Sequence, residues 1–180
     1  MRHLAVLLTT VFLAALATVG VSEVEPQKVD AATAVRTCGG GTINLADAER
    51  RMLTLHNQER AKRDLPRFCV HPALVRAARA HSKDMIQRDY FSHNTKGRNE
   101  DACERVRRYG YIWQFCAENF AWGSGALGTP DPIFDGWMNS SDHRSNILNR
   151  KYREIGIGAY RGTFQRYSDV TMWTVDFGDR

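Results

Sequence analysis

Apolar residues recur at helical spacing in the first half of the chain. The two stripes are Leu45, Ala48, Met52 and Leu55, and then Leu74, Ala77, Ala78, His81 and Met85. The first predicts a helix that begins at Leu45 or Ala46 after a capping Asn44 and ends before Pro66. The second predicts a helix that begins at His71-Pro72, with proline at its first position, and ends near Tyr90.

Shorter segments predict the rest of the secondary structure. We expect helices at about Asn99–Tyr109 and Pro132–Asn139, and strands at Cys116–Ala121, Glu154–Tyr160 and Thr171–Phe177, where alternation or β-branched residues appear. Helices come before strands, with no strand–helix–strand alternation. This order favours an α+β domain with layered helices and a mostly antiparallel sheet.

The first residues are typical of an export signal. A basic start, Met1-Arg2-His3, is followed by the uncharged stretch Leu4–Val21. We interpret residues 1–21 as a signal peptide, with cleavage at Ala15-Leu16-Ala17 or later at Ala32-Thr33-Ala34. The alternative is an uncleaved membrane anchor. Residues 22–41 are expected to be a linker or loose arm and 42–180 the domain, which is secreted and keeps no stable membrane span once the signal is cleaved.

Four cysteines in an exported chain are expected to pair. They allow three connectivities, and we favour Cys38–Cys69 and Cys103–Cys116 because these pairs close short loops. The first pair would tie the N-terminal arm to the loop after the first helix. This pairing would leave no thiol nucleophile.

The charge of the chain is moderately basic. The net charge is +5, and residues 51–110 carry fourteen Lys or Arg against seven Asp or Glu. This predicts either a solvated helical surface or a cationic face for anionic envelope polymers or lipid headgroups. Nucleic acid is excluded as a partner, because no nucleic-acid-binding motif occurs and the chain is expected to be exported.

Histidine and glutamate occur in four motifs of fixed order. The motifs are Phe91-Ser92-His93, Glu118-Asn119, Trp137-x-x-Ser140-x-x-His143-Arg144-x-x-Ile147-Leu148 and Glu154-Ile155-Gly156-Ile157-Gly158. In order and spacing they resemble the CAP superfamily of cysteine-rich secretory, antigen 5 and pathogenesis-related-1 proteins (SCP-domain proteins), in its bacterial secreted branch. The resemblance extends from about Leu45 to the C-terminus and implies a three-layer α-β-α sandwich.

The resemblance also implies a cleft formed by His93, Glu118, His143 and Glu154. His93 and His143 would be the ligands of a divalent metal such as zinc, although no cofactor is required. Glu118 and Glu154 would be the catalytic carboxylates if the cleft is an active site: one would orient an imidazole and the other would act on a bound water. A hydrogen-bonded polar cluster that only positions loops is the alternative.

Other residues give narrower expectations. Asp142 replaces the glycine that is common in the family before the motif histidine, and it is expected either to raise the proton affinity of His143 or to alter the backbone angles of the loop. His81 lies on the apolar stripe of its helix and is expected to be a satisfied core histidine. His56 is likewise expected to be structural.

Three functions fit these observations. The first is a monomeric extracellular binding module for a lipid, a sterol or an anionic envelope component. The second is a metal-assisted hydrolase, protease-like, that uses the same cleft. The third is a disulfide-stabilised extracellular scaffold.

Overall fold

The computed structural model describes residues 32–180. The predicted signal peptide at residues 1–21 lies outside the described residues, as does the first part of the predicted arm. The elements, in chain order, are β1 (Ala32–Arg36), β2 (Thr42–Ala46), α1 (Asp47–Ala61), β3 (Cys69–Val70), α2 (Pro72–Gln87), α3 (Ala102–Arg108), β4 (Phe115–Ser124), the 3-10 helix η1 (Gly125–Gly128), α4 (Pro130–Asn139), α5 (Ser141–Leu148), β5 (Glu154–Phe164) and β6 (Tyr167–Asp179).

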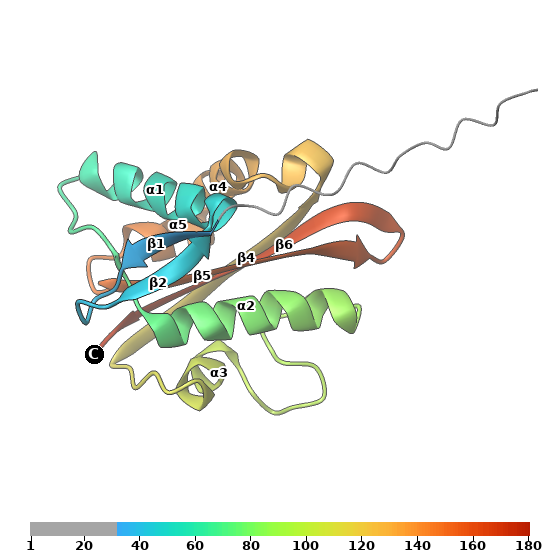
Figure 1. The fold of residues 1–180 in the computed structure, drawn as a ribbon, viewed down its shortest axis with the longest axis horizontal. Coiled ribbons are helices and arrows are strands. Elements are labelled where there is room, and N and C mark those ends of the chain that lie inside the picture. The colour runs from blue at the N-terminus through green and yellow to red at the C-terminus, as the bar shows by residue number, and fades with distance from the viewer. Residues whose placement is uncertain (1–31) are drawn as a thin grey trace, which may run out of the picture.

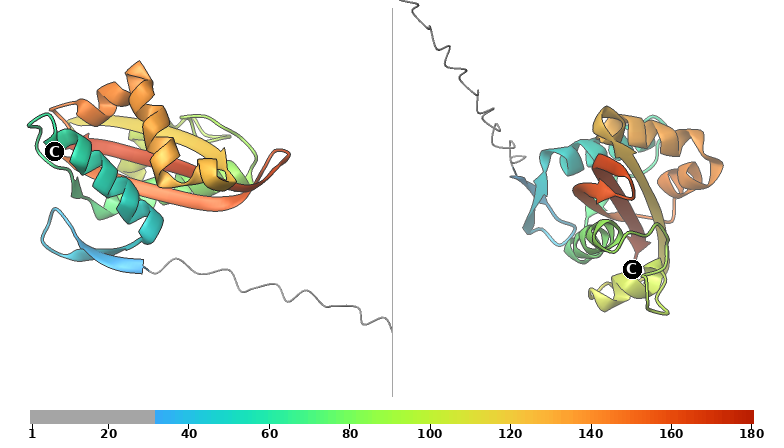
Figure 2. Two further views of the ribbon diagram at one scale, coloured as in Figure 1. Left: turned by 90° about the horizontal axis from the view of Figure 1, so that it is seen from above. Right: turned by 90° about the vertical axis from the view of Figure 1, so that its right-hand side faces the viewer.

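A four-stranded sheet forms the middle layer, with the strand order β3-β5-β6-β4. β6 pairs antiparallel with both β4 and β5, and the two-residue strand β3 pairs parallel with β5. Helices α2 and α3 lie on one side of the sheet, and α1, α4 and α5 lie on the other (Figures 1 and 2). The predicted α-β-α sandwich with a mostly antiparallel sheet is therefore confirmed.

Alternation along β5 and β6 gives the sheet two different faces. One face packs apolar side chains against α1, α4 and α5, and its members include Ile155, Ile157, Trp173, Val175 and Phe177. The other face lies under α2. There Gly156 and Gly158 have no side chain, and a Cβ at either position would overlap the backbone of α2 at Leu74 or Arg79. The Gly-x-Gly pattern of this motif thus lets α2 lie directly on the sheet.

The N-terminal part of the domain differs from our expectation. The residues of β1 belong to the expected loose arm, but they form a strand that pairs with β2 from Ala32↔Ala46 to Arg36↔Thr42. Asn44 and Leu45 therefore belong to a strand, and α1 begins later, at Asp47. The Glu49 side chain accepts a hydrogen bond from the Ala46 backbone N–H at 3.0 Å and so supports the start of the helix.

Two further helices differ from the sequence-based expectation. α3 begins at Ala102 rather than near Asn99, because Asp101 caps it by accepting a hydrogen bond from the Glu104 N–H at 2.8 Å. α5 is not predicted by the sequence pattern at all. Its sequence has almost no apolar periodicity, and Ile147 is its one fully buried residue, so the pattern that predicts the longer helices is absent here.

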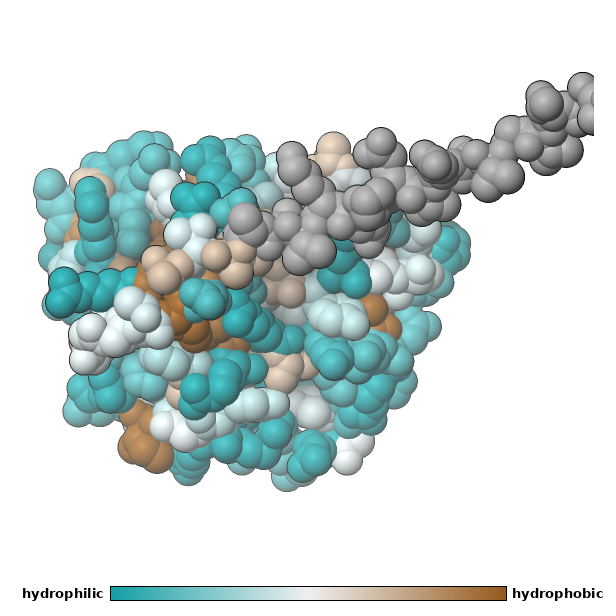
Figure 3. All heavy atoms as spheres, viewed as in Figure 1, coloured by the Kyte–Doolittle hydropathy of each residue, from teal (hydrophilic) through white to brown (hydrophobic). Residues whose placement is uncertain are grey.

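Both disulfides have the predicted pairing. Cys38 bonds to Cys69, and Cys103 bonds to Cys116. The first links the segment after β1 to β3, and the second links α3 to β4. By closing loops in the unfolded chain, each contributes about 3 kcal/mol. Among residues 32–180, no helix is both long and apolar enough to cross a membrane. The face drawn in Figure 3 is mostly hydrophilic, with apolar side chains in small areas.

Candidate functional site

Three of the four residues expected in the cleft are brought together by three different elements. His93 lies in the loop between α2 and α3, Glu118 lies in β4, and His143 lies in the first turns of α5. The two imidazoles are close enough that a charge on His93 lowers the pKa of His143. The Asn119 side chain also donates a hydrogen bond to the His143 carbonyl oxygen at 3.0 Å, which ties α5 to the strand that carries Glu118.

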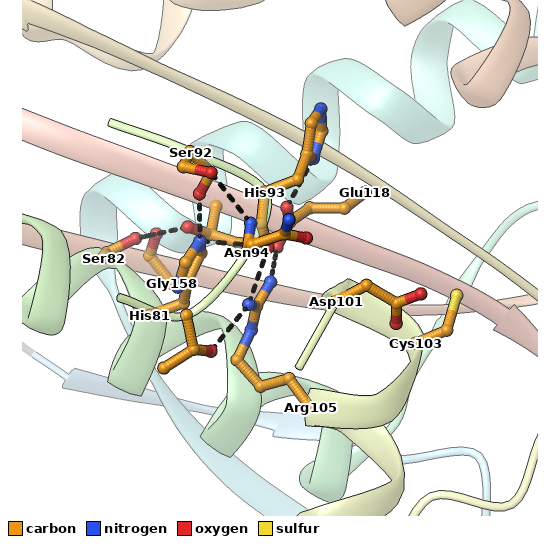
Figure 4. A network of polar contacts seen from close by, with 12 residues as sticks. His81, Ser82, Ser92, His93, Asn94, Asp101, Cys103, Arg105, Glu118 and Gly158 are labelled. Atoms are coloured by element: carbon orange, nitrogen blue, oxygen red, sulfur yellow. Dashed lines mark hydrogen bonds and ion pairs between the residues drawn. The ribbon is translucent and has the colours of Figure 1, made fainter. Parts of the chain in front are cut away.

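The buried carboxylate of Glu118 is the centre of this group. Its Oε1 lies 2.7 Å from His93 Nδ1, and its Oε2 pairs with the guanidinium of Arg105. Arg105 is itself buried and donates a second hydrogen bond to the His93 carbonyl oxygen at 2.9 Å. Figure 4 shows Arg105, from α3, and His93, from the loop, converging on Glu118. Arg105 therefore fixes both partners of the His93–Glu118 pair.

His81 lies beside this group but is held as a core residue, as expected. Its Nε2–H donates to the Ser92 carbonyl oxygen at 2.9 Å, and the same nitrogen is 4.0 Å from Glu118. Burial lowers the pKa of His81 to about 4, so the imidazole is neutral at pH 7. The expectation for His56 is confirmed too: it is fully buried, and its Nδ1 lies 2.8 Å from the Met52 carbonyl oxygen.

Asp142 raises the pKa of His143, as expected, but this effect is smaller than two others that lower it. Burial, and then the charge of His93, lower the pKa of His143, while Asp142 raises it by less. The His143 Nδ1 lies 2.9 Å from the Ser140 hydroxyl oxygen rather than on a carboxylate. His143 is therefore biased toward the neutral imidazole.

Glu154 makes its contacts elsewhere. Tyr111 donates a hydrogen bond to it at 2.6 Å, and the Arg180 guanidinium binds it at 2.8 Å. Burial raises the pKa of Glu154, but the hydrogen bonds from Arg180 and Tyr111 outweigh this and hold the pKa below its usual value. No hydrogen bond or ion pair joins Glu154 to His93, Glu118 or His143 within the described part of the chain.

The sheet register explains this separation. Glu118 pairs with Asp176 of β6, whereas Glu154 pairs with Gly178 of the same strand. The two glutamates therefore lie on strands on either side of β6. Across the sheet, their backbones are two strand spacings apart, or about 10 Å. Along β6, the residues they pair with are two positions apart. Three of the four expected residues are therefore grouped together, whereas Glu154 pairs with Arg180 at the C-terminal end of the chain.

Asp176, which sequence reasoning did not identify, lies next to Glu118. It is fully buried, and neither carboxylate oxygen has a hydrogen-bond partner in the described range 32–180. Burial, and then the charge of Glu118, raise the pKa of Asp176 well above its usual value. This environment favours a neutral, protonated Asp176 beside the Glu118–Arg105 pair.

The histidines suit an open site for a divalent ion. Glu118 and Ser140 engage the Nδ1 atoms of His93 and His143, which leaves the two Nε2 atoms as the ligand atoms. Zinc usually takes at least three protein ligands, so two imidazoles would hold an ion weakly. Among residues 32–180, the group that places three potential ligand atoms within 4.8 Å of one another is not this one but Cys38, Cys69 and Glu154. Its two sulfurs form a disulfide and are not thiolate ligands.

Comparison with known proteins places this geometry in context. The family model "CAP: Cysteine-rich secretory protein family" matches residues 53–177. The chain is 34% identical over 110 residues to the uncharacterized protein YkwD of Bacillus subtilis, covering 61% of this chain and 41% of that protein. It is 32% identical over 117 residues to the uncharacterized membrane protein YlbC of the same organism, covering 63% of this chain and 32% of that protein. The chain thus spans less than half the length of either relative.

Two solved structures are similar in fold. One is an extracellular protein containing a SCP domain from Bacillus anthracis, with a TM-score of 0.63 and 26% identity over 74% of this chain and 40% of that chain. The other is an outer surface protein from Borrelia burgdorferi, with a TM-score of 0.62 and 17% identity over 83% of this chain and 99% of that chain. The second likeness concerns the fold alone.

Proposed function

Because this chain belongs to the cysteine-rich secretory protein (CAP) family, we propose that it acts outside the cell as a binding protein for a lipid-like component of the cell envelope. Export is supported by the signal-like residues 1–21. It is also supported by the similarity to the Bacillus anthracis protein, which is described as extracellular. The ligand would have a polar head and an apolar part, and it would bind at His93.

The observation that carries this proposal is the surface around His93. Its side chain is 55% exposed, although its Nδ1 is held by a buried carboxylate. Its ring packs edge-on against Phe120, with ring centroids 4.4 Å apart, and Phe120 in turn contacts Phe91 at 4.3 Å. Phe91 is 45% exposed. A fixed polar nitrogen therefore stands beside exposed aromatic surface.

This combination favours a charged or strongly polar lipid over a sterol. The polar side chains Glu118 and Arg105 stand directly behind His93. A sterol offers a single hydroxyl to such a site and needs a larger apolar wall. An acyl chain lying on Phe91 and Phe120 would bury apolar area, while the head would accept or donate a hydrogen bond at His93 Nε2.

The test titrates the protein with lysophosphatidylglycerol below its critical micelle concentration. Binding is measured by the NMR chemical-shift changes of the backbone amides. Phe91→Ser and His93→Ala are each expected to weaken binding about tenfold, the equivalent of about 1.4 kcal/mol. The matched control is Leu127→Ser, because Leu127 is 70% exposed in η1 and lies outside the site. Equal weakening by the control, or shifts that avoid residues 91–93, would overturn the proposal.

A second candidate function is metal-assisted hydrolysis, favoured by the carboxylate–histidine pair of Glu118 and His93. A bound divalent ion would supply a Lewis acid and an activated water. In this chain, Glu118 would hold His93 in the tautomer that leaves Nε2 free, and neutral His143 would be ready to bind.

Zinc titration tests the ion site. His93→Ala/His143→Ala should abolish zinc binding, and Glu118→Gln should weaken it about 10–100-fold. Unchanged zinc affinity in the double variant would remove this candidate. If the ion binds but no peptide, ester or glycan in a broad panel is cleaved, hydrolysis is wrong and binding remains.

A further inference from the structure

A pocket that the proposed function does not use lies behind the His93 loop. It has a volume of about 220 Å³ and opens between α2, the loop before α3, and α3 itself. Its charged lining consists of four arginines and one acid: Arg88, Arg98, Arg105, Arg108 and Asp84. His81 also lines it and is neutral at pH 7, because burial lowers its pKa to about 4.

Most of these arginines already have an acidic partner. Arg105 pairs with Glu118, Arg108 pairs with Glu100 at 2.5 Å, and Arg88 lies 3.3 Å from Asp84. Each of these acids neutralises one arginine.

Two positive charges are left over. The Arg98 side chain is exposed and makes no hydrogen bond or ion pair with another described residue. Lys96, on the same loop, directs its Nζ to the Arg88 carbonyl oxygen at 2.8 Å and meets no carboxylate within the described residues. Arg98 lines the pocket and Lys96 lies on the loop beside it, so their combined positive charge is about equal and opposite to that of a phosphate dianion.

The loop that carries these residues is held by internal hydrogen bonds. The Thr95 N–H donates to the Glu100 carbonyl oxygen and the Arg98 N–H donates to the Thr95 carbonyl oxygen, each at 3.0 Å. The turn passes through Gly97 with φ +72°, a conformation that favours glycine. The Thr95 hydroxyl also donates to Glu100 at 2.7 Å. The loop backbone and the paired side chains of Arg105 and Arg108 are thus in place before any ligand arrives, which lowers the entropy cost of binding.

One donor at the pocket is unsatisfied. The Nε–H of Arg105 is buried and has no acceptor within residues 32–180. Its two terminal nitrogens are used by Glu118 and by the His93 carbonyl oxygen. An unpaired buried donor is unfavourable, so an anionic acceptor that reached it from the pocket that Arg105 lines would be stabilised.

We propose that this pocket binds a phosphate group carried by a small molecule or a lipid headgroup. Guanidinium groups match the oxygens of phosphate in geometry and form charge-assisted hydrogen bonds with them. Phosphate offers more acceptor oxygens than a carboxylate, and the arginines approach from two helices and a loop. The volume equals that of about seven water molecules at ~30 Å³ each, enough for a phosphate with a short substituent.

The test titrates the full chain, with both disulfides intact, with inorganic phosphate and with sn-glycerol 3-phosphate at constant ionic strength. Calorimetry measures affinity, and NMR of the arginine Nε–H groups locates the site. Arg98→Gln is expected to weaken binding about tenfold, and Arg88→Gln/Arg98→Gln to abolish it. Arg166→Gln is the matched control, because Arg166 is equally exposed but lies in the turn between β5 and β6.

The comparison of ligands identifies the source of the phosphate. Tighter binding of sn-glycerol 3-phosphate than of inorganic phosphate would assign the pocket to a headgroup, and equal binding would show that it recognises the phosphate group alone, as on a small molecule. Equal loss of binding in Arg98→Gln and Arg166→Gln would overturn the proposal. Sedimentation with phosphatidic acid vesicles that is unchanged in Arg88→Gln/Arg98→Gln, with no binding of the soluble phosphates, would overturn it as well. Phe91→Ser should leave phosphate binding unchanged, so this site and the lipid site can fail separately.

Discussion

Glu118 and Glu154 are two buried glutamates on the same face of the same sheet, yet they serve different parts of the molecule. Glu118 pairs with the buried Arg105 and holds the exposed imidazole of His93. Glu154 pairs with Arg180, whose side chain is 50% exposed, and accepts a hydrogen bond from Tyr111. The first carboxylate connects the core to a surface histidine, and the second fastens the C-terminus. The partners, not the motif, decide what each carboxylate can do.

The largest expected difference concerns stability. Glu118→Ala leaves the Arg105 guanidinium buried without a counter-charge and should reduce the free energy of unfolding by about 3–5 kcal/mol. Glu154→Ala leaves a buried Tyr111 hydroxyl unpaired and releases an arginine that is half in solvent, so a loss of about 1–3 kcal/mol is expected. Urea unfolding of both variants at pH 7 measures the two losses. Equal losses of unfolding free energy would mean that the burial of Arg105 does not make the Glu118 pair more important for stability than the Glu154 pair.

The next largest effect tests the carboxyl group beside Glu118. The pKa of Asp176 is higher in the folded protein than in the unfolded chain. Its contribution to the stability of the fold is therefore fully present below the pKa of the unfolded chain. This contribution is lost as the pH rises through the pKa of the folded protein. Asp176→Asn removes this loss. Relative to wild type, the variant should gain stability above about pH 4, by up to about 1.4 kcal/mol per pH unit.

Urea unfolding between pH 4 and 8 measures the gain for Asp176→Asn. The exposed Asp135→Asn serves as the control and should show no such trend. If Asp176→Asn instead became less stable than wild type as the pH rises, Asp176 would be ionised in the folded protein.

A smaller effect of opposite sign is expected at Glu154. Its folded pKa is lowered, so its stabilising contribution is present above the unfolded pKa and is lost as pH falls through the folded value. Glu154→Gln should therefore be less stable than wild type at pH 7 and should approach wild type below about pH 4. Because Arg180 is half exposed, the deficit should stay within about 1 kcal/mol and shrink in high salt. A deficit that persists unchanged at low pH would assign the effect to packing.

Sequence patterns could predict features that depend on local spacing. The apolar stripe of α2 and the Gly-x-Gly of β5 follow from side-chain periodicity and close backbone approach, and the disulfides follow from loop length. His93, Glu118 and His143 can be identified because each lies in a recognisable motif.

The remaining features depend on contacts that no local pattern encodes. Arg105 is one of three arginines in α3, and only the packing of that helix against β4 buries this one. Asp176 meets Glu118 through the register of β4 and β6. The same register moves Glu154 away from the histidines, although its motif suggested the opposite.

The smallest effect expected concerns a third carboxylate, Asp142, which acts on His143 through space and not through a hydrogen bond to the ring. Asp142 raises the pKa of His143 by less than burial and His93 lower it. Asp142→Asn keeps the side-chain shape in the first turn of α5 and removes the charge, so the pKa of His143 should fall slightly, because the charge that raises it is gone. NMR titration of the ring protons measures this, with the buried His81, whose pKa is about 4, as the internal control. An increase in the pKa of His143 would mean that Asp142 positions the imidazole through the backbone conformation of the loop. Asp142 would then orient the ring rather than attract its proton. Glu118 likewise orients the ring of His93.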